Sequence, residues 1–143
     1  MLLAAACAVA ALALAGCGGG GGSTITVIEH ATTDVTTDTG DTADSSGDVL
    51  TFANDVYNAD NTEKVGTDQG YCIRTVAGKS YECNWTTILE DGQITVEGTF
   101  YDTESSTLAI TGGTGSCDDA EGTMDLSANN DKATEFKFVF NLK

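Results

Sequence analysis

The chain has 143 residues, no proline and 17 glycines, and its six basic residues against 22 acidic ones give a formal net charge of −16 at pH 7. This length suffices for one domain with a hydrophobic core. A surface this acidic repels nucleic acid and anionic lipid, which excludes polynucleotide partners, and it suits solubility outside the cell or a high-salt habitat.

The N-terminus predicts a lipoprotein signal. Residues 2–15 are apolar and too short to span a bilayer comfortably, which is typical of a signal-peptide core. The run ends in Leu14-Ala15-Gly16-Cys17, which resembles a bacterial lipobox, where the peptide is cut before the cysteine and the thiol carries a diacylglycerol. A secretory signal followed by a chance cysteine is the alternative.

We therefore predict a signal peptide over residues 1–16, a lipidated Cys17 that opens a glycine-rich tether over 17–24, and one domain over 25–143. This order predicts an extracytoplasmic domain that a lipid anchors to the bacterial cell membrane. Disulfide bonds persist in that compartment.

The first predicted strand, residues 25–30, carries a candidate catalytic carboxylate. Ile25, Val27 and Glu29 share one face because side chains alternate along a strand. If that face is interior, burial raises the pKa of Glu29 toward the range of a useful general acid or base. Alternatively, Glu29 lies at a solvated strand end. His30 is the only histidine, and no G-x-S-x-G motif supports a Ser-His-Asp triad.

Residues 31–48 are rich in threonine and aspartate and predict a long surface loop that can act as a lid over an opening. Their aspartates do not follow the spacing of a calcium-binding loop, so we predict no metal site and no cofactor.

Residues 49–58 predict a strand on which Leu50, Phe52 and Asn54 share a face. Asn54 then points inward among apolar side chains. A buried amide needs hydrogen-bond partners, and a ligand can supply one of them.

The next strand, residues 71–76, predicts a disulfide bond. If Ala77-Gly78 is a two-residue turn, Val76 faces Lys79, Arg74 faces Tyr81 and Cys72 faces Cys83. Opposed cysteines outside the cytoplasm predict a cross-strand bond worth about 2–3 kcal/mol. Pairing of Cys117 with either cysteine is the alternative, and with Cys17 lipidated one thiol is left over.

Residues 79–101 predict the central hairpin, because Asp91-Gly92 is a strong two-residue turn signal between alternating runs. Its interior face then carries Trp85, with Gly98 opposite to make room for the indole. The expected facing pairs are Leu89 with Ile94, Thr87 with Val96, Trp85 with Gly98, and Cys83 with Phe100.

The C-terminal part predicts short strands at 107–111 and 124–126, a close turn at the glycines of 112–115, and a last strand with the cleanest alternation in the chain. Phe136, Phe138 and Phe140 share one face of that strand. The count of about eight strands predicts an all-β fold, an eight-stranded antiparallel β-barrel with room for side chains or one ligand.

Four motifs carry a family resemblance. The stretches GDVLTFANDVY, VGTDQGYC, DGQITVEGTF and LAITGGTG, followed by the phenylalanine-rich strand, resemble the allene oxide cyclase and dirigent superfamily over residues 25–143. The resemblance is closest to bacterial members with an allene-oxide-cyclase-like barrel. It implies an eight-stranded antiparallel barrel, often trimeric, with an apolar cavity. Plant allene oxide cyclases isomerise an unsaturated fatty-acid epoxide, and dirigent proteins steer coupling or cyclisation.

The resemblance also implies site residues. The family's cavity glutamate aligns with Glu29, a cavity asparagine with Asn54 and a cavity cysteine with Cys72. A second cavity asparagine falls at Ala31, and the cavity tyrosine of the plant enzymes falls at Phe100, which has no hydroxyl.

Three functions follow from these patterns. The first is binding of an apolar small molecule by a membrane-anchored barrel that can form a homotrimer, in a cavity lined by Asn54, Cys72, Trp85 and Phe100. The second is an isomerase or cyclase in which Glu29 supplies acid–base or electrostatic help. The third is a structural envelope protein whose aromatic residues form an ordinary filled core.

Overall fold

The computed structural model describes Cys17 and residues 22–143, and it consists of strands joined by turns and loops. The predicted signal peptide and residues 18–21 of the predicted tether lie outside the described residues. Within the described part, no helix is long and apolar enough to cross a membrane. The nine strands are β1 (Ser23–His30), β2 (Val35–Thr37), β3 (Val49–Asn58), β4 (Lys64–Val76), β5 (Ser80–Leu89), β6 (Gly92–Tyr101), β7 (Ser106–Gly115), β8 (Gly122–Ala128) and β9 (Glu135–Leu142).

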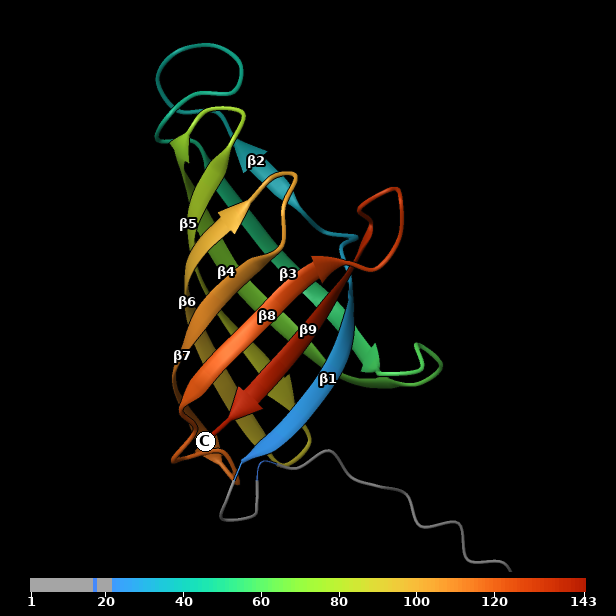
Figure 1. Cartoon of the computed structure of the whole chain (residues 1–143). Coiled ribbons are helices and arrows are strands. Elements are labelled where there is room, and N and C mark those ends of the chain that lie inside the picture. Colours follow the sequence, from blue (N-terminus) through green and yellow to red (C-terminus); the bar gives the residue numbers. More distant parts are fainter. Residues whose placement is uncertain (1–16, 18–21) are drawn as a thin grey trace, which may run out of the picture.

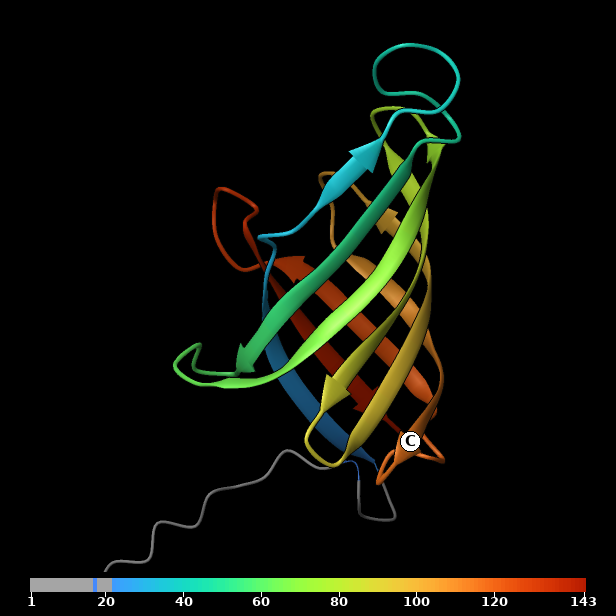
Figure 2. The same cartoon turned by 180° about the vertical axis from the view of Figure 1, so that it is seen from behind.

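The strands close into an antiparallel barrel, which confirms the predicted fold (Figures 1 and 2). The barrel has eight strands in the order β1-β9-β8-β7-β6-β5-β4-β3, and pairing of β1 with β3 closes it. Consecutive strands from β3 to β9 are neighbours, as expected when short turns join antiparallel strands.

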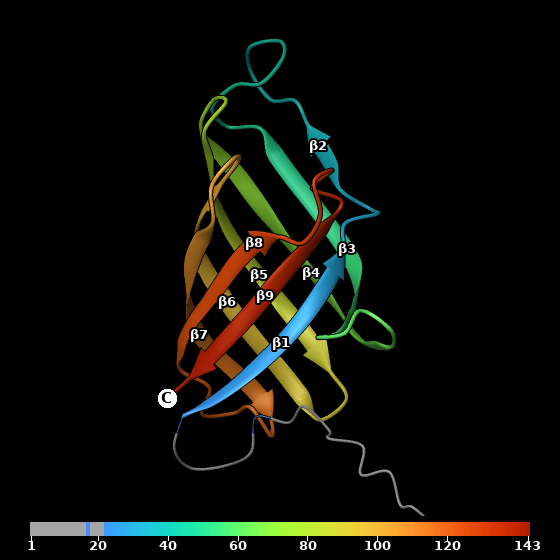
Figure 3. The ribbon, with the colours of Figure 1, turned by 45° about the vertical axis from the view of Figure 1, so that its right-hand side comes forward.

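The remaining strand, β2, lies within residues 31–48, the segment predicted as a loop. It pairs with residues 49–51 of β3, whereas β1 pairs with residues 55–58 of the same strand. The two short strands thus lie one after the other along β3, as Figure 3 shows. Between them the chain leaves the ladder at residues 31–34, beside the barrel interior.

The core follows from the alternation of apolar side chains. Phe138 and Phe140 on β9 are 1% and 0% exposed, and Met124 on β8 and Ile94 and Val96 on β6 are also completely buried. Burial of each large apolar side chain contributes about 1.5–3 kcal/mol. These side chains pack the barrel interior, with a hollow of about 660 Å³ at the end where β1 and β4 begin and a cavity of about 160 Å³ at the opposite end.

The β5–β6 register predicted from Asp91-Gly92 is wrong by two residues. The turn is Glu90-Asp91, so Leu89 pairs with Gly92, Trp85 with Val96, and Cys83 with Gly98. Neither Asp91 nor Gly92 adopts the positive φ that a two-residue Asp-Gly turn of type I′ requires. Gly92 serves a close strand approach instead, because a Cβ there would come within 2.2 Å of the Thr114 carbonyl oxygen.

The glycine that makes room for Trp85 is Gly70, not Gly98. Gly70 on β4 lies directly opposite Trp85. A Cβ at position 70 would lie 2.3 Å from the Trp85 Cβ and 2.4 Å from the Asn84 carbonyl oxygen.

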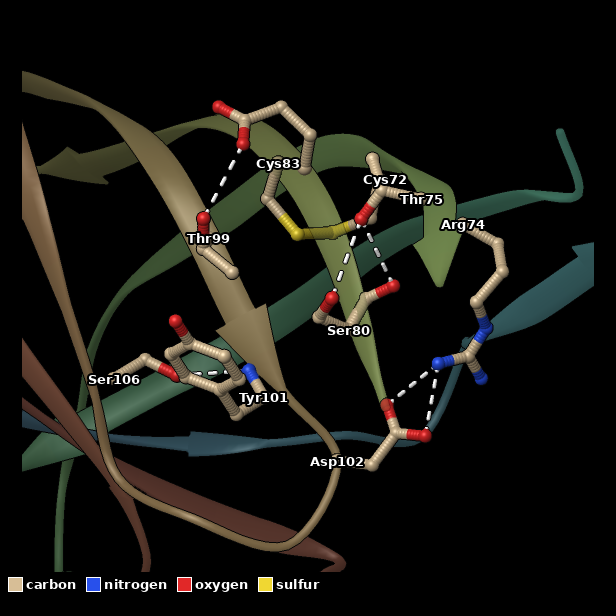
Figure 4. The surroundings of a disulfide bond; sticks show 10 residues. Cys72, Arg74, Thr75, Ser80, Cys83, Thr99, Tyr101, Asp102 and Ser106 are labelled. Carbon is tan, nitrogen blue, oxygen red and sulfur yellow. Dashed lines mark hydrogen bonds and ion pairs between the residues drawn. A yellow bond between two sulfur atoms is a disulfide. The ribbon is translucent and has the colours of Figure 1, made fainter. Parts of the chain in front are cut away.

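The predicted Cys72–Cys83 disulfide is confirmed, with the two cysteines paired across β4 and β5 (Figure 4). Arg74 faces Tyr81 as predicted. Val76, however, pairs with Ser80 rather than Lys79, because the turn has three residues and a bulge follows Arg74.

A second disulfide joins Cys17 to Cys117, 100 residues apart. The prediction that Cys117 is the leftover thiol is therefore wrong. One sulfur cannot carry both a disulfide and a thioether-linked lipid, so the Cys17–Cys117 bond and the predicted lipidation of Cys17 exclude each other in one molecule. The spacing of the cysteines in the sequence did not indicate this pair, because the two residues meet only when the last strands return to the start of β1. In the chain-entropy account, a disulfide that closes a loop this long stabilises the folded state by about 4–5 kcal/mol.

We expect the domain purified without reductant, from Cys17 onward, to show no free thiol. Peptide mapping by mass spectrometry should recover one peptide pair linked through Cys17 and Cys117 and another linked through Cys72 and Cys83. A diacylglyceryl mass on the Cys17 peptide together with a free Cys117 would contradict the first pairing and favour the lipidated form.

Candidate functional site

A cavity of about 160 Å³ opens at the upper end of the barrel in Figure 1, where β4, β6 and β8 end and β3, β5 and β9 begin. Four residues proposed from sequence line it together: Glu29, Cys72, Trp85 and Phe100. The complete lining comprises Glu29, Asp34, Leu50, Phe52, Cys72, Cys83, Trp85, Phe100, Leu126, Ala133, Phe136 and Phe138.

Five of the twelve residues in the cavity wall are aromatic. Trp85 packs edge-on to Phe52, with ring centroids 5.9 Å apart, and lies 5.6 Å from Phe138. Phe100 packs edge-on to Phe136 at 6.0 Å. Cys72 and Cys83 contribute their disulfide to the same wall. Such contacts hold rings in fixed orientations, so the cavity has a rigid apolar surface.

Glu29 is the buried acid of this cavity. Its side chain is only 6% exposed, so the alternative of a solvated strand end is wrong. Asn54 Nδ2 donates a hydrogen bond to Glu29 Oε1 at 2.8 Å. Burial raises the pKa of Glu29 to about 7, and this outweighs the lowering by the hydrogen bond from Asn54. The carboxyl therefore exchanges a proton near neutral pH, as a general acid or base must.

Asn54 points inward as predicted, but it supports the cavity rather than lining it. Its Oδ1 accepts hydrogen bonds from the backbone N–H groups of Thr32 and Thr33, each at 3.0 Å. Its Nδ2 also donates to Asp34 Oδ1 at 2.9 Å. The amide thus fills the break between β1 and β2 and holds both carboxylates in place.

Asp68 is a site residue that the sequence analysis missed. Its side chain on β4 is fully buried, and Asp68 Oδ1 accepts a hydrogen bond from the Asn54 backbone N–H at 3.3 Å. Burial and the nearby Glu29 carboxyl raise the pKa of Asp68 to about 9. Two adjacent buried carboxyls hold a proton between them more readily than either alone. At neutral pH Asp68 is therefore the protonated member of the pair.

The signal for Asp68 was present in the sequence. The predicted strand began at Tyr71, whereas β4 begins at Lys64. Extending the alternation of Cys72 backward brings Gly70 and Asp68 to the interior face. Asp68 also lies opposite Thr87, whose hydroxyl is completely buried and has no hydrogen-bond partner in the described part of the chain.

Arg74 fixes the loops around the cavity end. Its Nη1 donates to both carboxylate oxygens of Asp102, at 2.7 and 2.8 Å (Figure 4). Its guanidinium carbon lies 3.6 Å from the centre of the Tyr81 ring. Arg74 Nε lies 2.7 Å from Asp44 Oδ1, an ion pair rather than an aligned hydrogen bond. The segment predicted as a lid is therefore tied to the barrel through Asp44.

His30 lies outside the cavity. Its ring stacks on Tyr57 at 4.1 Å, and Nε2 lies 2.7 Å from Asn61 Oδ1. Ala31 also lies outside the cavity lining, and its backbone N–H bonds the Thr134 carbonyl. Neither residue adds a polar group to the cavity wall.

A family model described as allene oxide cyclase matches residues 29–140. The chain belongs to the allene oxide cyclase family. The match covers all three carboxylates of the site and every cavity-lining residue, so the family assignment rests on the same part of the chain that builds the cavity.

Solved structures agree with membership of the allene oxide cyclase family. A pyocyanin demethylase has 25% sequence identity and a TM-score of 0.75, over 85% of this chain and all of that one. A pterocarpan synthase dirigent protein has 16% identity and a TM-score of 0.68, over 87% of this chain and 97% of that one. An exo-specific intermolecular Diels-Alderase has 12% identity and a TM-score of 0.64, over 86% of this chain and 98% of that one. At these low identities, the dirigent protein and the Diels-Alderase are similar to this chain in fold alone.

Proposed function

We propose that the barrel binds a small, largely apolar molecule at its upper end, with a polar group of that molecule directed at Glu29. The observation that carries this proposal is a cavity with aromatic walls and one deeply buried carboxyl. Ligand sites typically combine apolar walls with a few placed polar groups.

The volume limits the size of the ligand. An apolar cavity of roughly 150 Å³ accommodates benzene, so about 160 Å³ suits a single ring with small substituents. A long-chain fatty-acid epoxide, the substrate class of the plant enzymes, exceeds this volume. The proposal is therefore a site for compact ligands.

Catalysis of an isomerisation or cyclisation is the second candidate function. It is supported by the pKa of Glu29, raised to about 7, and by Asp68, a second buried carboxyl coupled to it. Such a pair can take a proton from one position of a bound molecule and return it to another, while the walls restrict its conformation. The similar structures include one titled a demethylase and one titled a Diels-Alderase.

Toluene titration tests the binding proposal. Trp85 is the only tryptophan and lines the cavity, so its fluorescence should change saturably as toluene is added. Leu50→Phe narrows the cavity and should weaken binding at least about tenfold, because overpacking leaves no room for the ring. Ile73→Phe is the matched control, since residue 73 faces solvent one position along from Cys72. Equal weakening by both variants, or no saturation, would refute the proposal.

We also propose that the domain works outside the cytoplasm, supported by its two disulfides. Membrane anchoring through a lipid on Cys17 would belong to a form of the chain without the Cys17–Cys117 bond. A homotrimer, which the family resemblance implies, should appear in native mass spectrometry as a species of three times the chain mass.

A further inference from the structure

The charged groups that line the cavity are all acidic. Of its twelve lining residues, Glu29 and Asp34 carry carboxyls, and none is lysine, arginine or histidine. We propose that the cavity selects a small aromatic cation over a neutral ring of the same shape. This inference rests on the proposed function, because it specifies the class of ligand that the same cavity takes.

The aromatic wall favours a cation. The negative face of an aromatic ring attracts a cation within about 6 Å, and tryptophan does so most strongly. Trp85 and three phenylalanines, Phe52, Phe100 and Phe136, surround the space beside the two carboxyls. Because Trp85 is 3% exposed, water competes little for a cation beside it.

The hydrogen bonds of the site hold the carboxyls in place without neutralising them. One Asn54 amide group donates to Glu29 at 2.8 Å and to Asp34 at 2.9 Å, and it brings no charge. Arg74, the buried cation at this end, is already engaged by Asp102 and Asp44. A ligand cation would therefore supply the missing positive charge.

The surface charge acts in the same direction. A net charge of −16 raises the local concentration of cations around the protein and repels anions. The rim residue Asp34 lies between solvent and the cavity, so it extends this field to the entrance.

The test compares N-methylpyridinium with toluene, which have the same shape and differ by one positive charge. Titration of the whole domain at pH 8, followed by Trp85 fluorescence and calorimetry, should give about tenfold tighter binding of the cation. Lowering the pH from 8 to 6 protonates Glu29. This should weaken the binding of N-methylpyridinium several-fold and leave the binding of toluene unchanged. The other titratable groups around Glu29 are Asp34, Asp68 and His30.

Single-charge variants locate the effect. Glu29→Gln and Asp34→Asn should each reduce the preference for N-methylpyridinium over toluene at least threefold. Asp60→Asn removes the same charge at the other end of β3 and should leave the preference unchanged.

The outcomes separate this inference from the proposed function. Toluene binding as tightly as N-methylpyridinium at pH 8 would overturn cation selection while leaving the cavity as a ligand site. An equal loss of preference in Asp60→Asn would overturn it as well, because the effect would then come from net charge alone. Binding of neither probe would overturn both proposals.

Discussion

The stability of the Asp68→Asn variant relative to the wild type is expected to rise by about 2–3 kcal/mol between pH 7 and pH 9. The reason is the proton that folded Asp68 retains. Its pKa is raised from 3.8 to about 9, chiefly by burial, so the unfolded chain loses this proton far below the pH at which the folded chain does.

The sign of the effect follows from proton linkage. Stability falls with rising pH wherever the folded state binds more protons than the unfolded state, by about 1.4 kcal/mol per pH unit for each extra proton. Above pH 4 the folded wild type holds extra protons on Glu29, up to about pH 7, and on Asp68, up to about pH 9. Between pH 7 and 9 the fall in stability is due to Asp68.

Asparagine at position 68 resembles the protonated aspartic acid. Its oxygen can accept from the Asn54 backbone and its amide can donate to Glu29, without a proton to lose. Urea unfolding at pH 5, 7 and 9 should therefore show a profile for Asp68→Asn that is flat between pH 7 and 9 and falls about half as steeply as the wild type between pH 5 and 7, where only Glu29 still holds an extra proton. Parallel profiles over the whole range would contradict the assignment of the upper step to Asp68.

Gly70→Ala should be the most destabilising single methyl addition at the site, costing about 3 kcal/mol or more. The new Cβ would lie 2.3 Å from the Trp85 Cβ and 2.4 Å from the Asn84 carbonyl oxygen. Both atoms belong to the backbone or adjoin it, so relief requires β4 and β5 to separate. Trp85 would then shift and the cavity would change shape.

Gly78→Ala is the matched control. A Cβ there meets nothing within 4 Å, and only its φ of 66° disfavours alanine. We expect a loss of about 1 kcal/mol. Denaturant unfolding of both variants checks the difference, and toluene titration of Gly70→Ala should show weakened binding. Equal stabilities of the two variants would mean that the close approach of β4 to Trp85 does not constrain the barrel.

Much of the site could be predicted because strand alternation is local. Counting in twos along single strands brought Glu29, Cys72, Trp85 and Phe100 to interior faces, and all four line one cavity. The family resemblance selected Glu29, Asn54 and Cys72 independently. The barrel itself followed from the number and length of the alternating runs.

The missed features depend on contacts between distant segments. Gly92 was assigned to a turn because Asp-Gly favours one, but the position is a glycine because the backbone of Thr114 passes beside it. The acid pair requires Glu29 on β1 and Asp68 on β4 to meet across β3. The Cys17–Cys117 bond needs the closed barrel to bring its ends together. No local pattern contains this information.

The two hypotheses for the aromatic residues are both partly correct. Phe140 is completely buried in an ordinary core, while Trp85, Phe100, Phe136 and Phe138 line an open volume beside it. This division explains how a small domain can remain stable and still keep a cavity. It also puts the acid pair at the boundary between core and cavity.

The indole N–H resonance of Trp85 gives the most direct test that the upper cavity is the ligand site. One tryptophan gives one indole signal in a ¹⁵N-correlated NMR spectrum, and its Nε1 has no hydrogen-bond partner in the described part of the chain. On titration with toluene, we predict that this signal and the amide signals of Thr32 and Thr33 shift together and saturate. Saturable shifts confined to residues away from Trp85, Thr32 and Thr33, or no shift at all, would contradict a ligand site at the upper end of the barrel.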